Sequence, residues 1–255
     1  MYQEQRFEKI LTLLEERGNL SVKEMVDELE VSKDTVRRDF DCLSQRNLAQ
    51  RTHGGILPVK NTTVLGFQER QKGLTEDKKK MVDLALILVK DQALLFFDVS
   101  TLMLEVSQKL TKKITVYSHS LDNALILSGK EGVDFHLLGG RFYSKNRFYY
   151  SLHEAQLLQH LQFDLAFFGA ASLSQGVVSY EDEEDVAVKQ LAMQAARTKI
   201  LIAESGKYEK HSKYILSKIE DFDYWITDKK PDPDLVEALK DKVTILYDGK
   251  DSDYE

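Results

Sequence analysis

The chain has 255 residues, a formal net charge of −7 and a single cysteine, Cys42. No apolar run approaches the roughly 20 residues of a membrane span, and the charged N-terminus, MYQEQRFEK, lacks the apolar stretch of a secretory signal. These features exclude an internal disulfide and favour a cytoplasmic protein with one small and one larger domain.

Three short helices are predicted in the first 47 residues. Apolar residues recur at helical spacing in residues 7–14 and 22–29, and Gly18 and Ser21 are suited to end the first helix and begin the second. Ser32 is the predicted cap of a third helix. The apolar stripe of that helix consists of Val36, Phe40 and Leu43.

Two adjacent arginines lie near the start of the third predicted helix. At about 100° per residue, Arg38 points away from the apolar stripe, and Arg37 lies on its flank. One interpretation is a solvated face on which the arginines pair with Asp34 and Asp41. The other is a recognition surface for an acidic partner.

Residues 48–56, LAQRTHGGI, predict two short strands around a glycine turn, which together form a wing. The second and third helices in front of it have the helix-turn-helix arrangement, whose second helix enters the major groove of DNA. Arg51 and His53 on the wing are expected to reach phosphates or the minor groove. Gly54 and Gly55 allow the backbone to approach closely.

Charge is sorted within the first 60 residues. Residues 1–31 carry four basic and eight acidic residues, a net charge of −4, whereas residues 32–60 carry six basic and three acidic residues, a net charge of +3. A basic surface on an acidic protein indicates that the acidic partner is double-stranded DNA.

Residues 58–74 show little periodicity and predict a linker between domains at residues 1–57 and 75–255. Thr75 is suited to cap the helix that follows. Three lysines at 78–80 begin this helix, and they indicate either a solvated charge run or a second DNA contact.

The second domain alternates short apolar runs with helical stretches, which predicts a doubly wound, mainly parallel, Rossmann-like α/β sheet. The runs are of the kind buried on both faces of a sheet. They are residues 93–98, 114–118, 133–140, 164–170, 199–204, 223–228 and 243–247. Helices are predicted between them at residues 102–110, 153–161, 185–196 and 234–240.

Polar groups follow several of these predicted strands, where ligands of open α/β sheets bind. Asp98, Ser100 and Thr101 come after the first strand and open a helix, a place where amides and hydroxyls hold phosphate. The groups after later strands are Ser118-His119-Ser120, Gly139-Gly140-Arg141 and Gly169-Ala170-Ala171, and later segments add Lys189 and Lys207.

The run TVRRD at residues 35–39, followed by THGG at residues 52–55, resembles the N-terminal signature of the DeoR family of bacterial transcriptional regulators. The resemblance implies a winged helix-turn-helix domain that binds operator DNA, usually as a repressor. It also implies a role for each residue at the start of the third helix. Ser32, Lys33 and Thr35 would hold phosphates, and Arg37 and Arg38 would contact phosphates or guanines.

The second domain resembles the sensor domain of the same family, which is similar in fold to ribose-5-phosphate isomerase. In that family the domain binds phosphorylated sugars or related intermediates, which implies a regulator of carbohydrate-metabolism genes. Matched position by position, the family's Asp-x-Gly-Thr-Thr loop falls on residues 98–102 and its Thr-Asn pair on Ser118 and His119. Its glycine pair falls on Gly139 and Gly140, and its two lysines on Lys189 and Lys207.

The chain departs from the family pattern at the expected effector site. Ser100 replaces a glycine and Leu102 a threonine, so the loop loses a hydroxyl and some backbone freedom. Asp185 and Glu204 replace an expected Glu and Asp. His119 is expected either to donate to a ligand phosphate or to satisfy a buried carbonyl.

An alternative function is a sugar-phosphate isomerase with an added DNA-binding domain. Isomerisation needs a carboxylate base, and related isomerases carry an acidic cluster where this chain has residues 169–172, GAAS. Asp98 and residues 183–185 leave the alternative open, although it is disfavoured. A metal-responsive regulator has little support from the scattered histidines, and no metal or cofactor is expected. Because one winged helix makes a small interface, a homodimer or higher oligomer is expected.

Overall fold

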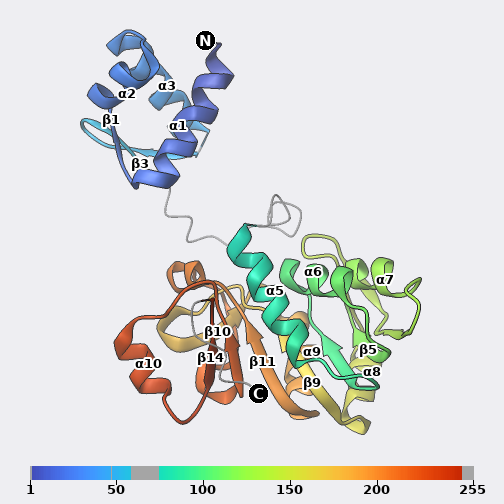
Figure 1. The fold of residues 1–255 in the computed structure, drawn as a ribbon. Helices are drawn as coiled ribbons and strands as arrows, with labels where there is room; N and C mark the ends of the chain where they lie inside the picture. Colours follow the sequence, from blue (N-terminus) through green and yellow to red (C-terminus); the bar gives the residue numbers. More distant parts are fainter. Residues whose placement is uncertain (1, 47, 59–74, 249–255) are drawn as a thin grey trace. The chain divides into compact units, whose positions relative to one another are not determined.

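The computed structural model describes residues 2–46, 48–58 and 75–248. The chain divides into two compact units, Met1–Asn61 and Thr62–Glu255 (Figure 1). Of the predicted linker, residues 59–74 lie outside the described residues. None of the helices within the described residues is long and apolar enough to span a membrane.

The first unit contains the three predicted helices and a small sheet (Figure 1). Its elements are α1 Gln3–Arg17, β1 Leu20–Ser21, α2 Val22–Leu29, α3 Lys33–Gln45, β2 Ala49–Arg51 and β3 Gly55–Pro58. Gly18 ends α1 at φ +73°, and the side chains of Ser21 and Ser32 accept hydrogen bonds from the first turns of α2 and α3. The predicted helix boundaries are confirmed because local capping chemistry sets them.

The wing is an antiparallel sheet with strand order β1-β3-β2. Its central strand begins at Gly55, where an added Cβ would lie only 2.0 Å from the carbonyl oxygen of Leu20. Of the two wing glycines, Gly55 therefore permits the close approach of β3 to β1, whereas Gly54 faces open space.

The second unit is built on a seven-stranded parallel sheet with order β14-β13-β11-β9-β4-β5-β6. Each strand falls on one of the seven predicted apolar runs. The strands are β4 Leu94–Phe97, β5 Ile114–Ser118, β6 Val133–Leu137, β9 Phe163–Phe168, β11 Ala196–Ile202, β13 Tyr224–Ile226 and β14 Thr244–Leu246. The chain winds from β4 to one edge and from β9 to the other, so the order reverses between these two strands.

Helices cover both faces of this sheet, and a hydrophobic cluster lies under each layer (Figure 1). One face carries α5 Glu76–Leu88, α6 Thr101–Lys109 and α7 Leu121–Leu127. The other carries α8 Leu152–Gln156 with the 3-10 turn Leu157–His160, α9 Glu183–Gln194 and α10 Pro233–Leu239. Three further 3-10 turns occur at Ser174–Gly176, Ser205–Glu209 and Ile219–Asp221.

Two strand pairs and α7 were not predicted. The pairs are β7 Arg141–Tyr143 with β8 Phe148–Tyr150 and β10 Val177–Tyr180 with β12 Tyr214–Lys218. The prediction of full burial was wrong for β6, because this strand lies at the edge of the sheet and Leu137 is 39% exposed.

Candidate functional sites: a DNA-binding surface and a buried charge cluster

The predicted recognition helix, α3, buries one side and exposes the other. Val36, Phe40 and Leu43 are fully buried, whereas Lys33, Arg37 and Arg38 are exposed. The Ser32 hydroxyl accepts a hydrogen bond from the Thr35 amide at 3.2 Å and lies 2.9 Å from the Thr35 hydroxyl. The start of α3 therefore presents hydroxyls and cations to solvent on a rigid frame.

The two arginines differ in their partners. Arg37 lies 3.7 Å from Asp34, a weak pair between exposed groups, as one of the two interpretations predicted. Asp41 pairs with Arg51 instead, at 2.7 Å. No ion pair of Arg38 is found with any described residue. Arg38 therefore keeps its donors available for an outside acceptor.

Arg51 holds the wing against α3. Its Nε donates to Asp41, its Nη1 donates to the carbonyl of Gly55 at 2.8 Å, and its guanidinium lies 5.6 Å from the ring centre of Phe40. His53 and Gly54 lie exposed at the tip of the wing. The side chain of Arg51 thus fixes the position of this tip.

A buried ion pair that the sequence analysis missed joins α1 to α3. The guanidinium of Arg6 donates to both carboxylate oxygens of Asp39, at 2.6 and 2.9 Å, and Asp39 is fully buried. The hydrogen bond to Asp39 raises the pKa of Arg6. Asp39 is the last residue of the TVRRD run and lies three positions after Val36, on the buried side of α3. A carboxylate at a buried helix position indicates a buried basic partner, and this pattern could have predicted the ion pair.

The carboxyl ends of β4 and β9 form the switch point of the second unit, where ligands of such sheets bind. Asp98 follows β4, and its Oδ2 accepts the amide of Gly169 after β9 at 2.8 Å. Ser100 caps α6 by accepting from the Met103 amide. An added Cβ on Gly169 would lie 2.8 Å from the Ser100 Cβ, so the two loops are in close contact.

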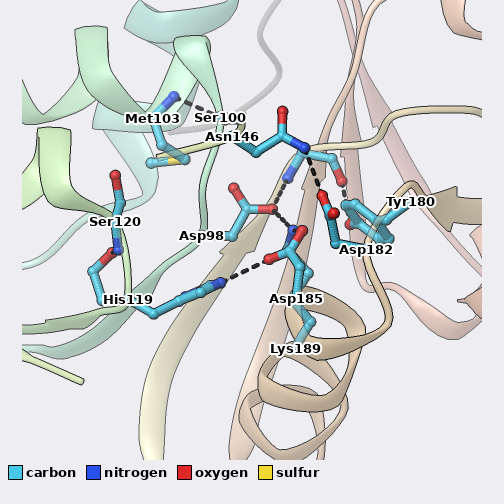
Figure 2. Close-up of polar contacts among 12 residues, drawn as sticks. Asp98, Ser100, Met103, His119, Ser120, Asn146, Tyr180, Asp182, Asp185 and Lys189 are labelled. Carbon is cyan, nitrogen blue, oxygen red and sulfur yellow. Dashed lines mark hydrogen bonds and ion pairs between the residues drawn. The ribbon is translucent and has the colours of Figure 1, made fainter. Parts of the chain in front are cut away.

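A buried charge cluster lies at this switch point, and we define it as Asp98, His119, Asp185 and Lys189. Figure 2 shows His119 and Lys189 directed at Asp185, with Nε2 and Nζ at 2.7 and 2.5 Å from its oxygens. Lys189 is fully buried, lies 3.4 Å from Asp98 and lies 3.8 Å from the ring centre of Tyr180. The cluster brings together two residues from the loops after β4 and β5 and two from α9.

The cluster is not fully satisfied by protein groups. Asp98 Oδ1 and His119 Nδ1 are buried without a hydrogen-bond partner among the described residues. Burial raises the pKa of Asp98 despite the nearby charge of Lys189. Burial also acts to raise the pKa of Asp185, but the charge of Lys189 and the hydrogen bonds from His119 and Lys189 lower it to about 2.

Beside the charge cluster is a small cavity of about 20 Å³, room for about one water molecule. It is lined by Val99, Ser100, Asn146, Ala170, Ala171, Tyr180, Glu181 and Asp185. The turn between β7 and β8 closes it, because the Asn146 side chain donates to Asp182 at 2.6 Å (Figure 2). Asn146 and Tyr180 were missed because neither follows a strand of the main sheet.

The remaining predicted effector residues lie in several places. Ser118 is buried and accepts from the Ser120 amide and the Asn123 side chain, and Thr101 is the first residue of α6. Gly139 is half-buried and Arg141 is exposed. Gly140 takes φ +124°, where an added Cβ would lie 2.2 Å from the Tyr150 carbonyl.

Lys207 lines a second cavity of about 420 Å³, which it shares with Lys78, Lys210, Lys229 and other residues at the ends of β11 and β13. The structure therefore does not bring all predicted effector residues around one cavity.

Two expectations for charged groups can be compared with the structure. The Nε2 atom of His119 lies 2.7 Å from the carboxylate of Asp185, a partner that neither alternative named, and a contact of His119 with a ligand phosphate stays a prediction. Lys78, Lys79 and Lys80 pair with Glu204, Glu76 and Asp248. No cluster of three potential metal ligands occurs among the described residues.

Exposed basic side chains on α3 of a winged helix-turn-helix unit, followed in the chain by a doubly wound α/β unit, define the class of two-domain DNA-binding regulators. The model of the DeoR-like helix-turn-helix domain matches residues 6–62, and that of the DeoR C-terminal sensor domain matches residues 74–229. The chain belongs to the DeoR family.

Its curated relatives include regulators of similar length. It is 32% identical over 254 residues to the HTH-type transcriptional repressor GlcR of Bacillus subtilis (strain 168), covering 98% of each chain. It is 32% identical over 253 residues to the lactose phosphotransferase system repressor of Lactococcus lactis subsp. lactis, covering 96% of this chain and 99% of the relative.

Among solved structures, ribose 5-phosphate isomerase A from Methanocaldococcus jannaschii matches 52% of this chain and 53% of its own, with 13% identity and a TM-score of 0.38. This likeness is too low to support an argument about function. The predicted fold class, a winged helix-turn-helix followed by a Rossmann-like α/β domain, is confirmed by the two units themselves.

Proposed function

We propose that this chain represses carbohydrate-metabolism genes by binding operator DNA through α3 and the wing, under the control of a phosphorylated sugar. The observation that carries the proposal is the two-sided α3, with a fully buried stripe and exposed Lys33, Arg37 and Arg38. DNA is the acidic partner that such a helix fits, because its N-terminal residues reach base edges in the major groove. The protein would then act in the cytoplasm.

Each residue of the DNA-binding surface has a proposed role. Ser32, Lys33 and Thr35 bind phosphates at the start of α3, where free amides also favour anions. Arg37 and Arg38 contact phosphates or guanines. At the wing tip, His53 and Gly54 approach the DNA, while Arg51 contributes by holding the wing. The proposed DNA-binding residues are therefore Ser32, Lys33, Thr35, Arg37, Arg38, Arg51, His53 and Gly54.

The proposed effector binds at the switch point beside the buried charge cluster. Asp98 Oδ1 and His119 Nδ1 have no hydrogen-bond partner among the residues that the structure describes, and a hydroxyl-rich ligand supplies donors and acceptors for such atoms. A cavity of about 20 Å³ is too small for a sugar phosphate, so binding requires the loop with Asn146 to separate from Asp182. The ligand's phosphate is proposed to extend toward Lys207.

We further propose that the second unit has no isomerase activity. An aldose–ketose isomerase needs a carboxylate base open to the substrate carbons. The loop after β9 supplies Gly169, Ala170 and Ala171, and the carboxylates of Asp98 and Asp185 are engaged with Lys189. A buried carboxyl with a raised pKa, such as Asp98, is the one feature that favours the enzyme, so turnover must be measured.

The test is fluorescence anisotropy on DNA from upstream of the gene and its neighbours, at one stated salt concentration. A panel of sugar phosphates is added, and each is also assayed for isomerisation. Selective binding that one phosphate changes by tenfold or more supports both roles. The variant Lys207→Ala should abolish that response and keep DNA binding, while the exposed control Lys213→Ala should change neither. Turnover of any sugar phosphate, or a lack of selective binding, would contradict the proposal.

A further inference from the structure

The seven-stranded sheet has two edges that differ in how they are covered. In β14, at one edge, Ile245 and Leu246 are buried. In β6, at the other edge, Leu137 is 39% exposed and the side chain of Asp134 is 70% exposed. An open edge presents unpaired backbone groups to any strand that can add to it.

The hydrogen-bond pattern shows which backbone groups of β6 face outward. The Leu138 amide donates to Ser118 of β5, and the Ile114 amide of β5 donates to Gly132. The backbone N–H and C=O groups of successive residues point to opposite sides of a strand. Those of Asp134 and His136 therefore also point toward β5, and those of Phe135 and Leu137 point away from it. Within the part of the chain that the structure describes, β5 is the one strand paired with β6.

The two faces of β6 carry different chemistry. The side chains of Val133, Phe135 and Leu137 share the face of the sheet toward α7, and those of Val133 and Phe135 pack against the hydrophobic cluster there. Asp134 and His136 share the opposite face, with Nε2 3.2 Å from the carboxylate, and the His136 ring stacks on Tyr117.

We propose that β6 pairs antiparallel with β6 of a second copy of this chain, centred on Phe135, and joins the two sheets into one. In this register Asp134 lies opposite His136 of the second copy, twice by symmetry, and Val133 lies opposite Leu137. The outward backbone groups of Phe135 then bond to their own equivalents. A self-complementary pattern of this kind fits an isologous dimer.

Neighbouring registers are less favourable, which makes the proposal specific. A pairing centred on Asp134 places two aspartates directly opposite each other, and like charges there are destabilising. A pairing centred on His136 opposes two histidines and leaves Asp134 opposite Leu138. Only the register centred on Phe135 matches Asp134 with His136 at both positions.

The surface beside the strand extends this contact. Leu125 of α7 is 67% exposed and lies about 200° around the helix from Asn123, whose side chain accepts a hydrogen bond from Ser107 of α6. It therefore lies on the flank of α7 away from α6. A two-fold axis perpendicular to the sheet places both copies of α7 on the same face, next to the joined strands.

Sedimentation equilibrium of the full chain without DNA or effector tests the interface. The wild type should be a dimer. The variant His136→Glu places a glutamate opposite Asp134 of the other copy at two symmetric positions, so the dissociation constant of the dimer should rise at least tenfold. The double variant Asp134→Lys and His136→Glu should restore the dimer, and the control His153→Glu, on the exposed surface of α8, should leave it unchanged. A monomeric wild type, or a His136→Glu dimer as tight as the wild type, would overturn the proposal.

Disulfide trapping provides a second test that does not depend on charge. In the Cys42→Ser background, Phe135→Cys places two thiols opposite each other at a Cα separation of about 5.5 Å, within the range for a disulfide. Oxidation should yield a covalent dimer, whereas Glu131→Cys, outside the paired register, should not. Equal trapping of both variants, or of neither, would contradict the register. Failure here leaves the proposed DNA and effector roles standing, because neither is measured.

Discussion

Both units bury charged groups, but the two units differ in how completely hydrogen bonds and ion pairs satisfy these groups. In the first unit, Arg6 donates to both oxygens of Asp39, a closed pair that joins α1 to α3. In the second, Asp98 Oδ1 and His119 Nδ1 of the charge cluster have no hydrogen-bond partner within the described part of the chain. A satisfied pair indicates a structural role, whereas buried polar atoms left without partners require a further explanation, such as a ligand.

This difference relates to what each unit is proposed to do. The DNA-binding surface must keep α3 in one orientation, so a fixed ion pair beneath it is suitable. The sensor must exchange one set of contacts for another when a ligand arrives, and groups that are only partly satisfied are available for this.

The largest expected effect is that of Lys189→Met. It leaves Asp98 and Asp185 buried without their shared cation, and breaking a buried pair costs about 3–5 kcal/mol. Urea unfolding monitored by Trp225, the chain's one tryptophan, reports on the second unit alone. The exposed control Lys218→Met should change stability by less than about 0.5 kcal/mol. A loss below about 1 kcal/mol from Lys189→Met would show that the cluster does not depend on this cation.

The matching change in the first unit is Arg6→Ala, with an expected loss of about 3 kcal/mol because Asp39 stays buried and uncompensated. Hydrogen exchange of the α3 amides measures this unit separately. The control Arg46→Ala removes an exposed pair with Glu4 and should cost at most about 1 kcal/mol. Equal exchange in both variants would argue against the closed pair as the support of α3.

Acid should destabilise the charge cluster through Asp185. Its pKa is about 2 in the folded chain and about 3.9 in an unfolded one, so its stabilising contribution is present above pH 4 and declines as the pH falls toward 2. Because one pKa unit corresponds to about 1.4 kcal/mol, the contribution is about 2–3 kcal/mol. Urea midpoints of the wild type and Asp185→Asn should therefore differ most at pH 6, and the difference should fall by about half at pH 3. A constant difference across this range would contradict the lowered pKa.

The smallest expected change in stability is that of Arg38→Ala, which should alter DNA binding instead. Operator affinity should fall by about tenfold, within the 1–3 kcal/mol of a base contact, while the unfolding free energy stays within about 0.5 kcal/mol. Anisotropy at fixed salt measures this. Arg17→Ala on α1 is the matched control, because it removes an exposed arginine outside α3. Unchanged affinity for Arg38→Ala would place the recognition surface elsewhere.

The fold was predictable because its signals are local. Periodic apolar residues and caps such as Ser32 identify α3 from a few neighbouring positions, and each of the seven apolar runs became a strand of the sheet. The hairpin of β7 and β8 was missed, since its short strands carry no alternation that distinguishes them from a loop. The exposure of β6 was also missed, because position at an edge depends on strand order.

The candidate effector site was predictable only in part. Polar residues after β4 and β5 were expected at the switch point, and Asp98, Ser100 and His119 do lie there. Their partners were not predicted, because Asp185 is 66 positions from His119 in the chain. The closure of the cavity by Asn146 depends on a hairpin that the sequence analysis did not contain.

The sequence by itself determined the helix-turn-helix, the outward direction of Arg38 and the strands of the main sheet, because each depends on spacing between near neighbours. Its TVRRD and THGG runs also carried the resemblance to the family. The tertiary structure alone decided the pairing of Arg6 with Asp39, the burial of Lys189 between two carboxylates and the open edge at β6. These features depend on which distant segments the topology brings together. Burial then makes the contacts strong, because water no longer competes for the charged groups.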